Sequence, residues 1–406
     1  MFEPYPHFAP NHLAAFTLAA LPKLQFGWGI RNQLASHIQK TCQNPLFIVS
    51  QSIKNSDFGQ HFFSNFDSQK KGEPPCIHTV SGEPSPDLVD KIVANTPDSI
   101  DWVIGIGGGS VLDTAKAVAG LLPSRTSVMD YLEGVGAGKP YPGDALPWLA
   151  VPTTAGTGSE TTKNAVLSRL GQFKKSFRHE ALVAKEVWLD PSFLPELPRK
   201  VLHATAMDAF TQLLESYTTR HATPITDALA WHGMQLWHGA LEGATKGDQN
   251  AWGRLMLAAT FSGITLANAG LGAVHGLAGP IGAYIPAPHG EVCAALLAPV
   301  TRANLVALQA DGNPAQQQSL KKYAQVGRLL ANDNSLSDHQ ALQRLPDQLD
   351  ILNQHFGPGT LAQYGLNDAV SKKVVASCRA GSMLGNPIEL SDEVLLNILK
   401  NLRLNS

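Results

Sequence analysis

Hydrophobic positions in the first half of the chain alternate between two spacings. Short apolar runs predict buried strands at Leu46–Ser50, Ile77–Val80 and Trp148–Val151. The first strand is expected to end at Gln25–Trp28. Apolar residues three and four apart predict helices between successive strands, at Ile30–Lys40, Phe58–Phe66 and Leu88–Ala94. This alternation predicts a Rossmann-like parallel sheet with helices on both faces, a fold that binds ligands at the carboxyl ends of its strands.

The end of this half departs from the simple alternation. Asn164–Ser168 and Phe173–Arg178 flank Gly171 and predict a hairpin, and Val183–Leu189 predicts one more strand. Beyond Leu197-Pro198 the strand signals nearly vanish, and the rest of the chain predicts an all-α domain. Its expected helices are Lys200–Arg220, Ile225–Leu241, Ala251–Asn268, Glu291–Leu308, Lys321–Ala331, Asp338–His355, Asp368–Cys378 and Glu393–Leu402, with a polar loop at Asp311–Gln318.

Length supports this division. A chain of 406 residues exceeds the size at which one hydrophobic core usually stops growing. We therefore expect an α/β domain over residues 1–195 and an all-helical domain over residues 196–406.

Composition excludes several classes of partner. The 31 basic and 33 acidic residues give a net charge of −2, so no basic excess indicates nucleic acid or an anionic membrane as a partner.

The four cysteines lie far apart with no C-x-x-C spacing, which predicts reduced thiols. Residues 1–24 lack a basic segment followed by an apolar core, and we expect a cytoplasmic protein.

Three consecutive glycines follow the strand that begins near Trp102. Gly107, Gly108 and Gly109 lead into helical spacing at Val111–Val118, so the stretch predicts strand, tight loop and helix. Free backbone amides at such a helix N-terminus form a cradle for the phosphates of a dinucleotide. Ser110 stands where the common fingerprint has its third glycine, and a glycine-rich turn that only packs the helix explains this stretch equally well.

A second loop rich in hydroxyls and glycines follows the next strand, at Pro152–Glu160. Hydroxyls of Thr153, Thr154 and Thr157 could donate to phosphate or ribose oxygens at the same edge of the sheet. Taken alone, the segment is better explained as a polar turn.

The helical half carries candidate metal ligands. Asp208 and Gln212 lie four residues apart on a largely apolar helix, and His275 and His289 lie among small and apolar residues. The aspartate and the two histidines can form a mononuclear divalent-metal site with open positions, although on spacing alone two hydrogen-bonded core histidines explain the pattern better.

These motifs occur together and in order, and the chain resembles the iron-containing (group III) alcohol dehydrogenases, which have the dehydroquinate synthase-like fold. The resemblance covers nearly the whole length. It includes Gly107-Gly108-Gly109-Ser110-x-x-Asp113-x-x-Lys116, Pro152–Glu160, Asp190-Pro191, Met207-Asp208-Ala209, His275–Ala278, Pro288-His289-Gly290 and Gly385-Asn386-Pro387.

The resemblance implies an NAD(P)-dependent oxidoreductase that transfers hydride between nicotinamide and an alcohol or a carbonyl compound. Its implied cofactor contacts are Gly107, Gly108, Gly109, Ser110, Asp113, Thr153, Thr154, Thr157, Asn164 and Lys175. Its implied ligands for one divalent metal, Fe²⁺ or Zn²⁺, are Asp208, His275 and His289, with Gln212 at the fourth ligand position. It also implies a homodimer formed through the first strand, and no side chain is assigned as a general base.

Three departures from the family pattern define the alternatives. Gln212 stands where the family usually has a histidine ligand, Gly279 replaces a histidine near the substrate, and Ser50-Gln51 lacks the aspartate of NAD-preferring relatives. An amide is a weaker ligand than imidazole, so a metal-independent reductase resembling maleylacetate reductase is one alternative. A non-redox lyase like dehydroquinate synthase and a non-catalytic binding protein are the others. NADP⁺ use stays open because no carboxylate repels a 2′-phosphate at Ser50.

Overall fold

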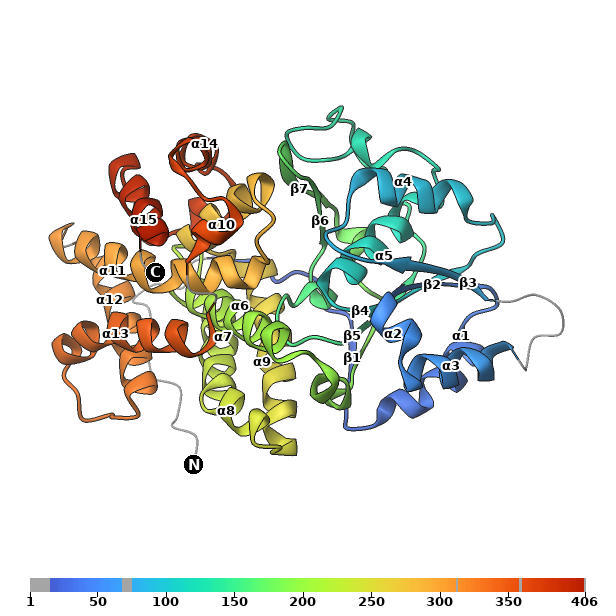
Figure 1. Cartoon of the computed structure of the whole chain (residues 1–406), viewed down its shortest axis with the longest axis horizontal. Helices are drawn as coiled ribbons and strands as arrows, with labels where there is room; N and C mark the ends of the chain where they lie inside the picture. The colour runs from blue at the N-terminus through green and yellow to red at the C-terminus, as the bar shows by residue number, and fades with distance from the viewer. Residues whose placement is uncertain (1–14, 68–74, 312, 358–359, 405–406) are drawn as a thin grey trace. The chain divides into compact units, whose positions relative to one another are not determined.

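The chain folds into two compact units (Figure 1). The structure is a computed structural model that describes residues 15–67, 75–311, 313–357 and 360–404. Most of residues 1–24, in which no targeting signal is expected, therefore lies outside the described residues. One unit comprises Ala20–Leu197, and the other begins at Pro198 and also includes residues 15–19. Our expected division at 195/196 falls at the end of the 3₁₀ helix η5 (Pro191–Glu196), two residues before the observed one.

A six-stranded parallel sheet forms the centre of the first unit. Its strands, in spatial order, are β1 (Lys23–Phe26), β8 (Glu186–Leu189), β5 (Trp148–Pro152), β4 (Trp102–Gly107), β2 (Pro45–Ser50) and β3 (Cys76–Val80). Each neighbouring pair is parallel. The α/β class with a parallel sheet, expected from the alternating pattern, is therefore confirmed.

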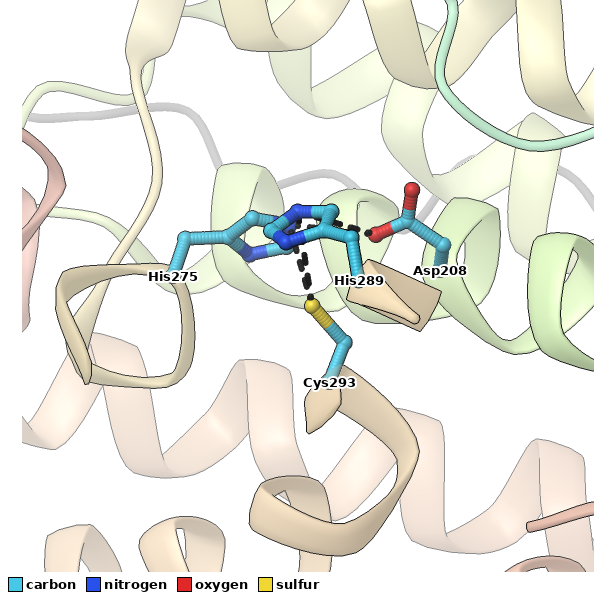
Figure 2. Close-up of side chains that lie close together, drawn as sticks. All are labelled: Asp208, His275, His289 and Cys293. Carbon is cyan, nitrogen blue, oxygen red and sulfur yellow. Dashed lines mark hydrogen bonds and ion pairs between the residues drawn. The ribbon is translucent and has the colours of Figure 1, made fainter. Parts of the chain in front are cut away.

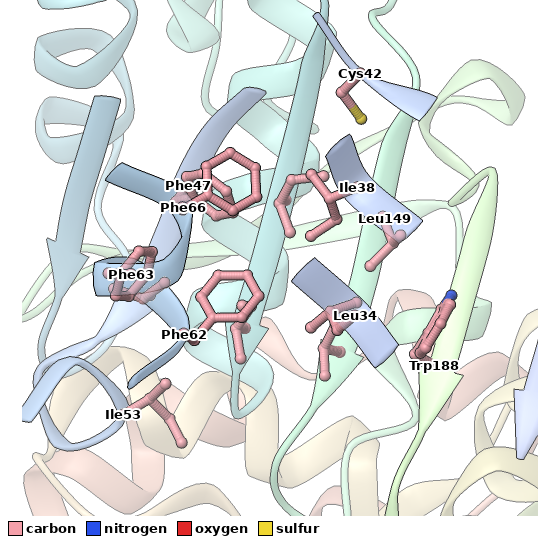
Figure 3. Close-up of a cluster of buried hydrophobic side chains, with 14 of the residues drawn as sticks. Leu34, Ile38, Cys42, Phe47, Ile53, Phe62, Phe63, Phe66, Leu149 and Trp188 are labelled. Atoms are coloured by element: carbon pink, nitrogen blue, oxygen red, sulfur yellow. The ribbon is translucent and has the colours of Figure 1, made fainter. Parts of the chain in front are cut away.

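One face of this sheet packs against two helices (Figure 3). Leu34 and Ile38 of α1 (Leu34–Thr41), together with the phenylalanines of α3 (Asp57–Asp67), meet alternate strand residues such as Phe47 and Leu149. Each fully buried phenylalanine contributes about 1.5–3 kcal/mol. The short α2 (Gln51–Asn55) precedes α3.

The helix α5 (Gly109–Leu121) packs on the sheet through strand residues, such as Gly105, that alternate with the strand residues packed against α1 and α3. A Cβ placed on Gly105 would lie 2.9 Å from the Cβ of Ala115, so glycine at this position allows the close approach of α5. α4 (Pro86–Asn95) packs against α5, and the Ser85 hydroxyl caps its start by accepting from the amide of Leu88.

The expected hairpin is confirmed as the antiparallel pair β6 (Asn164–Arg169) and β7 (Phe173–Arg178). The strand expected at Val183–Leu189 is shorter, because Glu180–Leu182 forms a 3₁₀ turn and only Glu186–Leu189 pairs in the sheet. The remaining 3₁₀ helices of this unit are η1 (Ile30–Gln33), η2 (Val128–Asp130) and η3 (Ser159–Thr161).

All regular elements among the described residues of the second unit are helices, as expected. Its α-helices are α6 (Arg199–Thr218), α7 (Pro224–Trp237), α8 (Ala240–Thr245), α9 (Gln249–Ala269), α10 (Ala273–Tyr284), α11 (His289–Asp311), α12 (Pro314–Ala331), α13 (Asp338–Phe356), α14 (Asp368–Ser377) and α15 (Asp392–Leu404). Two 3₁₀ helices, η6 (Leu361–Tyr364) and η7 (Gly381–Gly385), complete it. Every residue of α6 from Ala206 to Thr218 is buried, so α6 is the central helix of this unit.

Three details of the helical half differ from the expectation. The helix expected at Ile225–Leu241 is broken into α7 and α8 at Gly239, whose φ of +69° is left-handed. α12 begins at Pro314, inside the segment expected to be a polar loop. α10 was not expected because it contains glycines and Pro280, but tertiary packing stabilises it: a Cβ on Gly276 would lie 2.9 Å from that of Met383.

One described helix is long and apolar enough to span a bilayer, namely α11. However, 72% of its most apolar window is buried inside the protein. This burial is typical of the core helix of a globular domain.

Candidate metal centre and cofactor loops

The glycine loop joins β4 to α5 and has the predicted strand–loop–helix form. Gly108 is the N-cap residue in an extended conformation, and its carbonyl accepts from the amides of Val111 and Leu112. Gly109 and Ser110 therefore occupy the first turn of a 13-residue helix, where backbone amides have no intrahelical acceptor. The loop can receive an anion at the positive end of α5.

The threonine loop after β5 lies directly beside the glycine loop. β4 and β5 are neighbouring parallel strands, and the amide of Thr153 donates to the carbonyl of Gly107 at 3.0 Å. A Cβ on Gly109 would lie 2.7 Å from Cγ2 of Thr157, and one on Gly108 would lie 3.1 Å from Cγ2 of Thr154. The structure thus brings the expected glycines and threonines together at one edge of the sheet.

Asp113 and Lys116, from the same motif, form hydrogen bonds inside the protein. Oδ1 of Asp113 accepts from the Ser159 hydroxyl at 2.5 Å, and Oδ2 accepts from the amide of Val166 at 3.0 Å. Burial raises the pKa of Asp113, while Lys116 and these two hydrogen bonds act in the opposite direction. The carboxylate therefore ties α5 to η3 and β6, and its implied contact with a cofactor stays a prediction.

The buried ammonium of Lys116 connects α5 to the segment that leads into the hairpin. Its Nζ donates to the carbonyls of Ser159 and Asn164 at 2.9 and 2.8 Å and to the hydroxyl of Thr162 at 2.9 Å. Burial lowers the pKa of Lys116, although the neighbouring Asp113 opposes this shift. Lys116 is therefore a structural cation.

Two residues of the β6–β7 hairpin, Asn164 and Lys175, are expected to contact the cofactor, and they do not lie opposite each other. Asn164 pairs with Arg178, whereas Lys175 pairs with Leu167. Lys175 is half-buried, and its ammonium has no ion pair or hydrogen bond within the described part of the chain. It is available to pair with an anion.

Three of the four expected metal ligands converge in the helical unit (Figure 2). Oδ1 of Asp208 on α6 lies 3.3 Å from Nε2 of His275 on α10 and 3.8 Å from Nε2 of His289 at the start of α11. Asp208 is buried. Burial acts to raise its pKa, but the charge of His289 and the hydrogen bond from His275 outweigh burial, so the pKa is lowered.

The fourth member of this cluster is Cys293, which sequence reasoning missed. Its Sγ lies 3.6 Å from Nε2 of His275 and 3.7 Å from Nε2 of His289. All four potential ligand atoms lie within 4.8 Å of one another. The spacing of His289 and Cys293, four residues apart on α11, was the available signal that they share a helix face. Burial raises the pKa of the free thiol to about 12.

The fourth expected ligand, Gln212, has a different partner. Its Oε1 accepts from the hydroxyl of Ser262 on α9 at 2.7 Å, deep in the helical core. This hydrogen bond orients the amide of Gln212 toward α9.

Glu215 contacts His275 on the side of the ring away from the other three donors, and sequence reasoning also missed this residue. Its Oε2 lies 2.5 Å from Nδ1 of His275, and its carboxylate accepts from the amides of Val274 and His275. Burial acts to lower the pKa of His275, but Cys293, Asp208 and Glu215 outweigh burial and raise that pKa well above its usual value. Because Glu215 holds Nδ1, Nε2 of His275 faces the other three donors.

The two other departures from the family pattern have simple local structures. The hydroxyl of Ser50, at the carboxyl end of β2, caps α2 by accepting from the amide of Ile53 at 3.1 Å. A Cβ placed on Gly279 of α10 would meet no heavy atom of the described residues within 4 Å, apart from its chain neighbours and the adjacent backbone of α10 itself.

Two family models match almost the whole chain. One, described as iron-containing alcohol dehydrogenase, matches residues 22–191. The other, the C-terminal model of the Fe-containing alcohol dehydrogenase family, matches residues 202–403. The two matches correspond closely to the two compact units.

Curated proteins give the same result. The chain is 30% identical over 354 residues to long-chain-alcohol dehydrogenase 1 of Geobacillus thermodenitrificans, and the match covers 86% of each chain. It is 37% identical over 209 residues to lactaldehyde reductase of Escherichia coli, covering 50% of this chain and 53% of that one.

Solved structures share the fold. An archaeal alcohol dehydrogenase from a Red Sea brine pool matches with a TM-score of 0.85 at 22% identity, covering 96% of this chain and 99% of that chain. A 1,3-propanediol oxidoreductase matches with a TM-score of 0.82 at 24% identity, covering 96% of this chain and 100% of that chain.

Proposed function

The chain belongs to the iron-containing alcohol dehydrogenase family, and from this premise we propose that it interconverts a small alcohol and its aldehyde or ketone with a nicotinamide cofactor and one divalent metal ion. The observation that carries the proposal is the convergence of Asp208, His275 and His289 in a chain that also has the glycine and threonine loops. The reaction is a hydride transfer between C4 of the nicotinamide and the carbon that bears the substrate oxygen.

The first unit supplies the groups proposed to bind the dinucleotide. Backbone amides of Gly109 and Ser110 would receive the diphosphate at the positive end of α5, and the threonine hydroxyls beside them would donate to phosphate or ribose oxygens. Lys175 would contribute a positive charge, since its ammonium has no partner among the described residues.

The second unit supplies the groups proposed to hold the metal. Asp208 would offer Oδ1, and the two histidines would offer Nε2, in an arrangement fixed for His275 by Glu215. When bound, a divalent ion would polarise the carbon–oxygen bond of the substrate as a Lewis acid. Gly279 would leave space beside this cluster for the substrate, since nothing described beyond its chain neighbours and the adjacent backbone of α10 lies within 4 Å of its built Cβ.

We further propose that NADP(H) is accepted as well as NAD(H). The carboxyl end of β2 carries Ser50, whose hydroxyl already caps α2, and Gln51 follows it. Neither residue would repel a 2′-phosphate.

A homodimer is the proposed assembly. β1 is an edge strand of the sheet, and Leu24, Phe26 and Trp28 on and after it are exposed. Pairing of two such edges would cover this apolar surface. Light scattering on the purified protein tests the proposal. It should give twice the mass of one chain for the natural protein and the mass of one chain for the Phe26→Lys variant.

The four free thiols support the proposed cytoplasmic location.

Metal add-back tests the central proposal. The protein is stripped with a chelator, and oxidation of NADH and NADPH is followed with short aldehydes and no metal, Fe²⁺ or Zn²⁺. Activity that returns only with metal supports the proposed function. Equal activity without metal would favour a metal-independent reductase, the alternative indicated by Gln212, whereas a lyase would show no steady cofactor consumption.

A further inference from the structure

Cys293 occupies the place in the cluster that a fourth ligand needs. Family resemblance puts that ligand at Gln212, but the side-chain oxygen of Gln212 accepts a hydrogen bond from Ser262 on α9. We propose that Cys293, as a thiolate, replaces it as the fourth metal ligand. The site would then use Asp208 of α6, His275 of α10, and both His289 and Cys293 of α11, and would select Zn²⁺ over Fe²⁺. This inference deepens the metal site of the proposed function and rests on it.

Distances between the four donors support a single four-ligand site, to which a substrate oxygen would add as a fifth ligand. Zinc lies about 2.0–2.1 Å from imidazole nitrogen or carboxylate oxygen and about 2.3 Å from thiolate sulfur. At tetrahedral angles, these bond lengths separate nitrogen and sulfur by about 3.6 Å and nitrogen and oxygen by about 3.3 Å. In this structure Sγ of Cys293 lies 3.6 and 3.7 Å from the two Nε2 atoms. Oδ1 of Asp208 lies 3.3 and 3.8 Å from them.

The elements that carry the donors also favour coordination by Cys293. His289 and Cys293 lie one turn apart on α11, so one face of this helix presents both donors. Figure 2 shows the sulfur pointing toward the two imidazole rings from below in that view, while the carboxylate of Asp208 points toward them from the right. Cys293, Asp208 and His275 are buried, whereas His289 is partly exposed, so the cluster is enclosed on the side of Cys293 and accessible on the side of His289.

The chemistry of the donor set determines the preferred metal. Thiolate is a soft ligand that favours zinc, whereas an amide oxygen is a hard ligand and adds little affinity for either metal. On binding, the thiol loses its proton to solvent as the sulfur–metal bond forms, and no electron is transferred. Replacement of the usual fourth ligand by sulfur therefore raises the preference for Zn²⁺ over Fe²⁺.

Cobalt substitution tests coordination without measuring catalysis. The chelator-stripped protein is titrated with Co²⁺, and the sulfur-to-cobalt charge-transfer absorption in the near ultraviolet is recorded. We expect this band at one Co²⁺ per chain in the natural protein, its loss in Cys293→Ser, and its retention in Gln212→Ala and in Cys378→Ser. Cys378 is the matched control because it is a second buried free thiol of the same unit, outside the cluster.

X-ray absorption on the natural protein loaded with Zn²⁺ avoids dependence on a variant that fails to fold. One sulfur neighbour at about 2.3 Å supports the proposal. A zinc-loaded protein with only nitrogen and oxygen neighbours overturns it. Competition titrations add a second measure, in which Cys293→Ser should weaken Zn²⁺ binding by more than about tenfold and lower the ratio of Zn²⁺ to Fe²⁺ affinity.

Turnover assays on the same samples separate this inference from the proposed function. A protein that shows the sulfur band but no metal-dependent turnover retains the thiolate ligand and refutes the proposed reaction. Metal-dependent turnover in a cobalt- or zinc-loaded protein without sulfur coordination supports the reaction and refutes the role of Cys293.

Discussion

The carboxylate of Glu215 lies 2.5 Å from Nδ1 of His275 and directs the other ring nitrogen, Nε2, toward Asp208. Glu215 and Asp208 both belong to α6, seven residues apart, so two turns of one helix supply a candidate ligand and the residue that orients another. The close approach depends on Gly272, because a Cβ there would lie 2.9 Å from Oε1 of Glu215.

Glu215→Gln should weaken metal binding without removing a ligand. Loss of the negative charge behind His275 lowers the basicity of its Nε2 and leaves the ring less firmly oriented. Loss of such an outer partner costs about ten- to hundredfold in metal affinity. Competition with a chromophoric chelator measures the effect. Glu242→Gln, on the exposed side of α8, is the matched control, and equal affinities in the two variants would contradict the role of Glu215.

Sequence patterns predicted where the glycine and threonine loops lie because each loop follows a strand directly. Neighbouring parallel strands end at the same edge, so the loops after Gly107 and Pro152 had to meet. Cys293 and Glu215 were missed for a different reason. Helical spacing shows that His289 and Cys293 share a face, but which face meets α6 depends on the packing of α10 and α11. The glycine-rich sequence of α10 gives no helix signal of its own.

Gly109→Ala should impair dinucleotide binding. The added methyl group would lie 2.7 Å from Cγ2 of Thr157 and would push the two loops apart. We expect NADH affinity to fall by about tenfold or more and stability to fall by about 1–3 kcal/mol from overpacking. Fluorescence titration and thermal unfolding measure the two effects. In the double variant Gly109→Ala/Thr157→Ala, the unfolding temperature should recover in part while NADH binding stays weak. Unchanged NADH affinity in the single variant Gly109→Ala would refute the proposed binding of the diphosphate by the glycine loop.

Lys116→Met should destabilise the first unit. It would leave the largely buried carboxylate of Asp113 without its cation and would remove the shorter of the two hydrogen bonds to the carbonyl of Asn164. Breaking a buried pair in this way costs about 3–5 kcal/mol, measured as the free energy of unfolding in urea. Lys139→Met, which breaks the exposed pair with Asp130, should cost less than about 1 kcal/mol. Similar losses in both variants would show that Lys116 has no special structural role.

Metal uptake should release protons. Burial raises the pKa of the Cys293 thiol to about 12, so the thiol is protonated at neutral pH and must lose its proton to bind metal. Protons therefore compete with the metal, and affinity should rise about tenfold per pH unit for this proton across pH 6–8. His275, whose pKa is also raised, adds a second proton below that pKa. Calorimetry in buffers of different ionisation enthalpy counts the protons, and Cys293→Ser should release one fewer.

Ser50→Asp should shift cofactor preference toward NADH. Aspartate retains the helix-capping function of Ser50 on α2, so folding should be preserved, while its charge at the end of β2 would repel the 2′-phosphate of NADPH. The ratio of kcat/KM for NADPH to that for NADH should fall by about tenfold or more. Ser50→Asn, a neutral capping residue of the same shape, should leave the ratio near its original value. An unchanged ratio in Ser50→Asp would mean that the adenine ribose does not approach the end of β2.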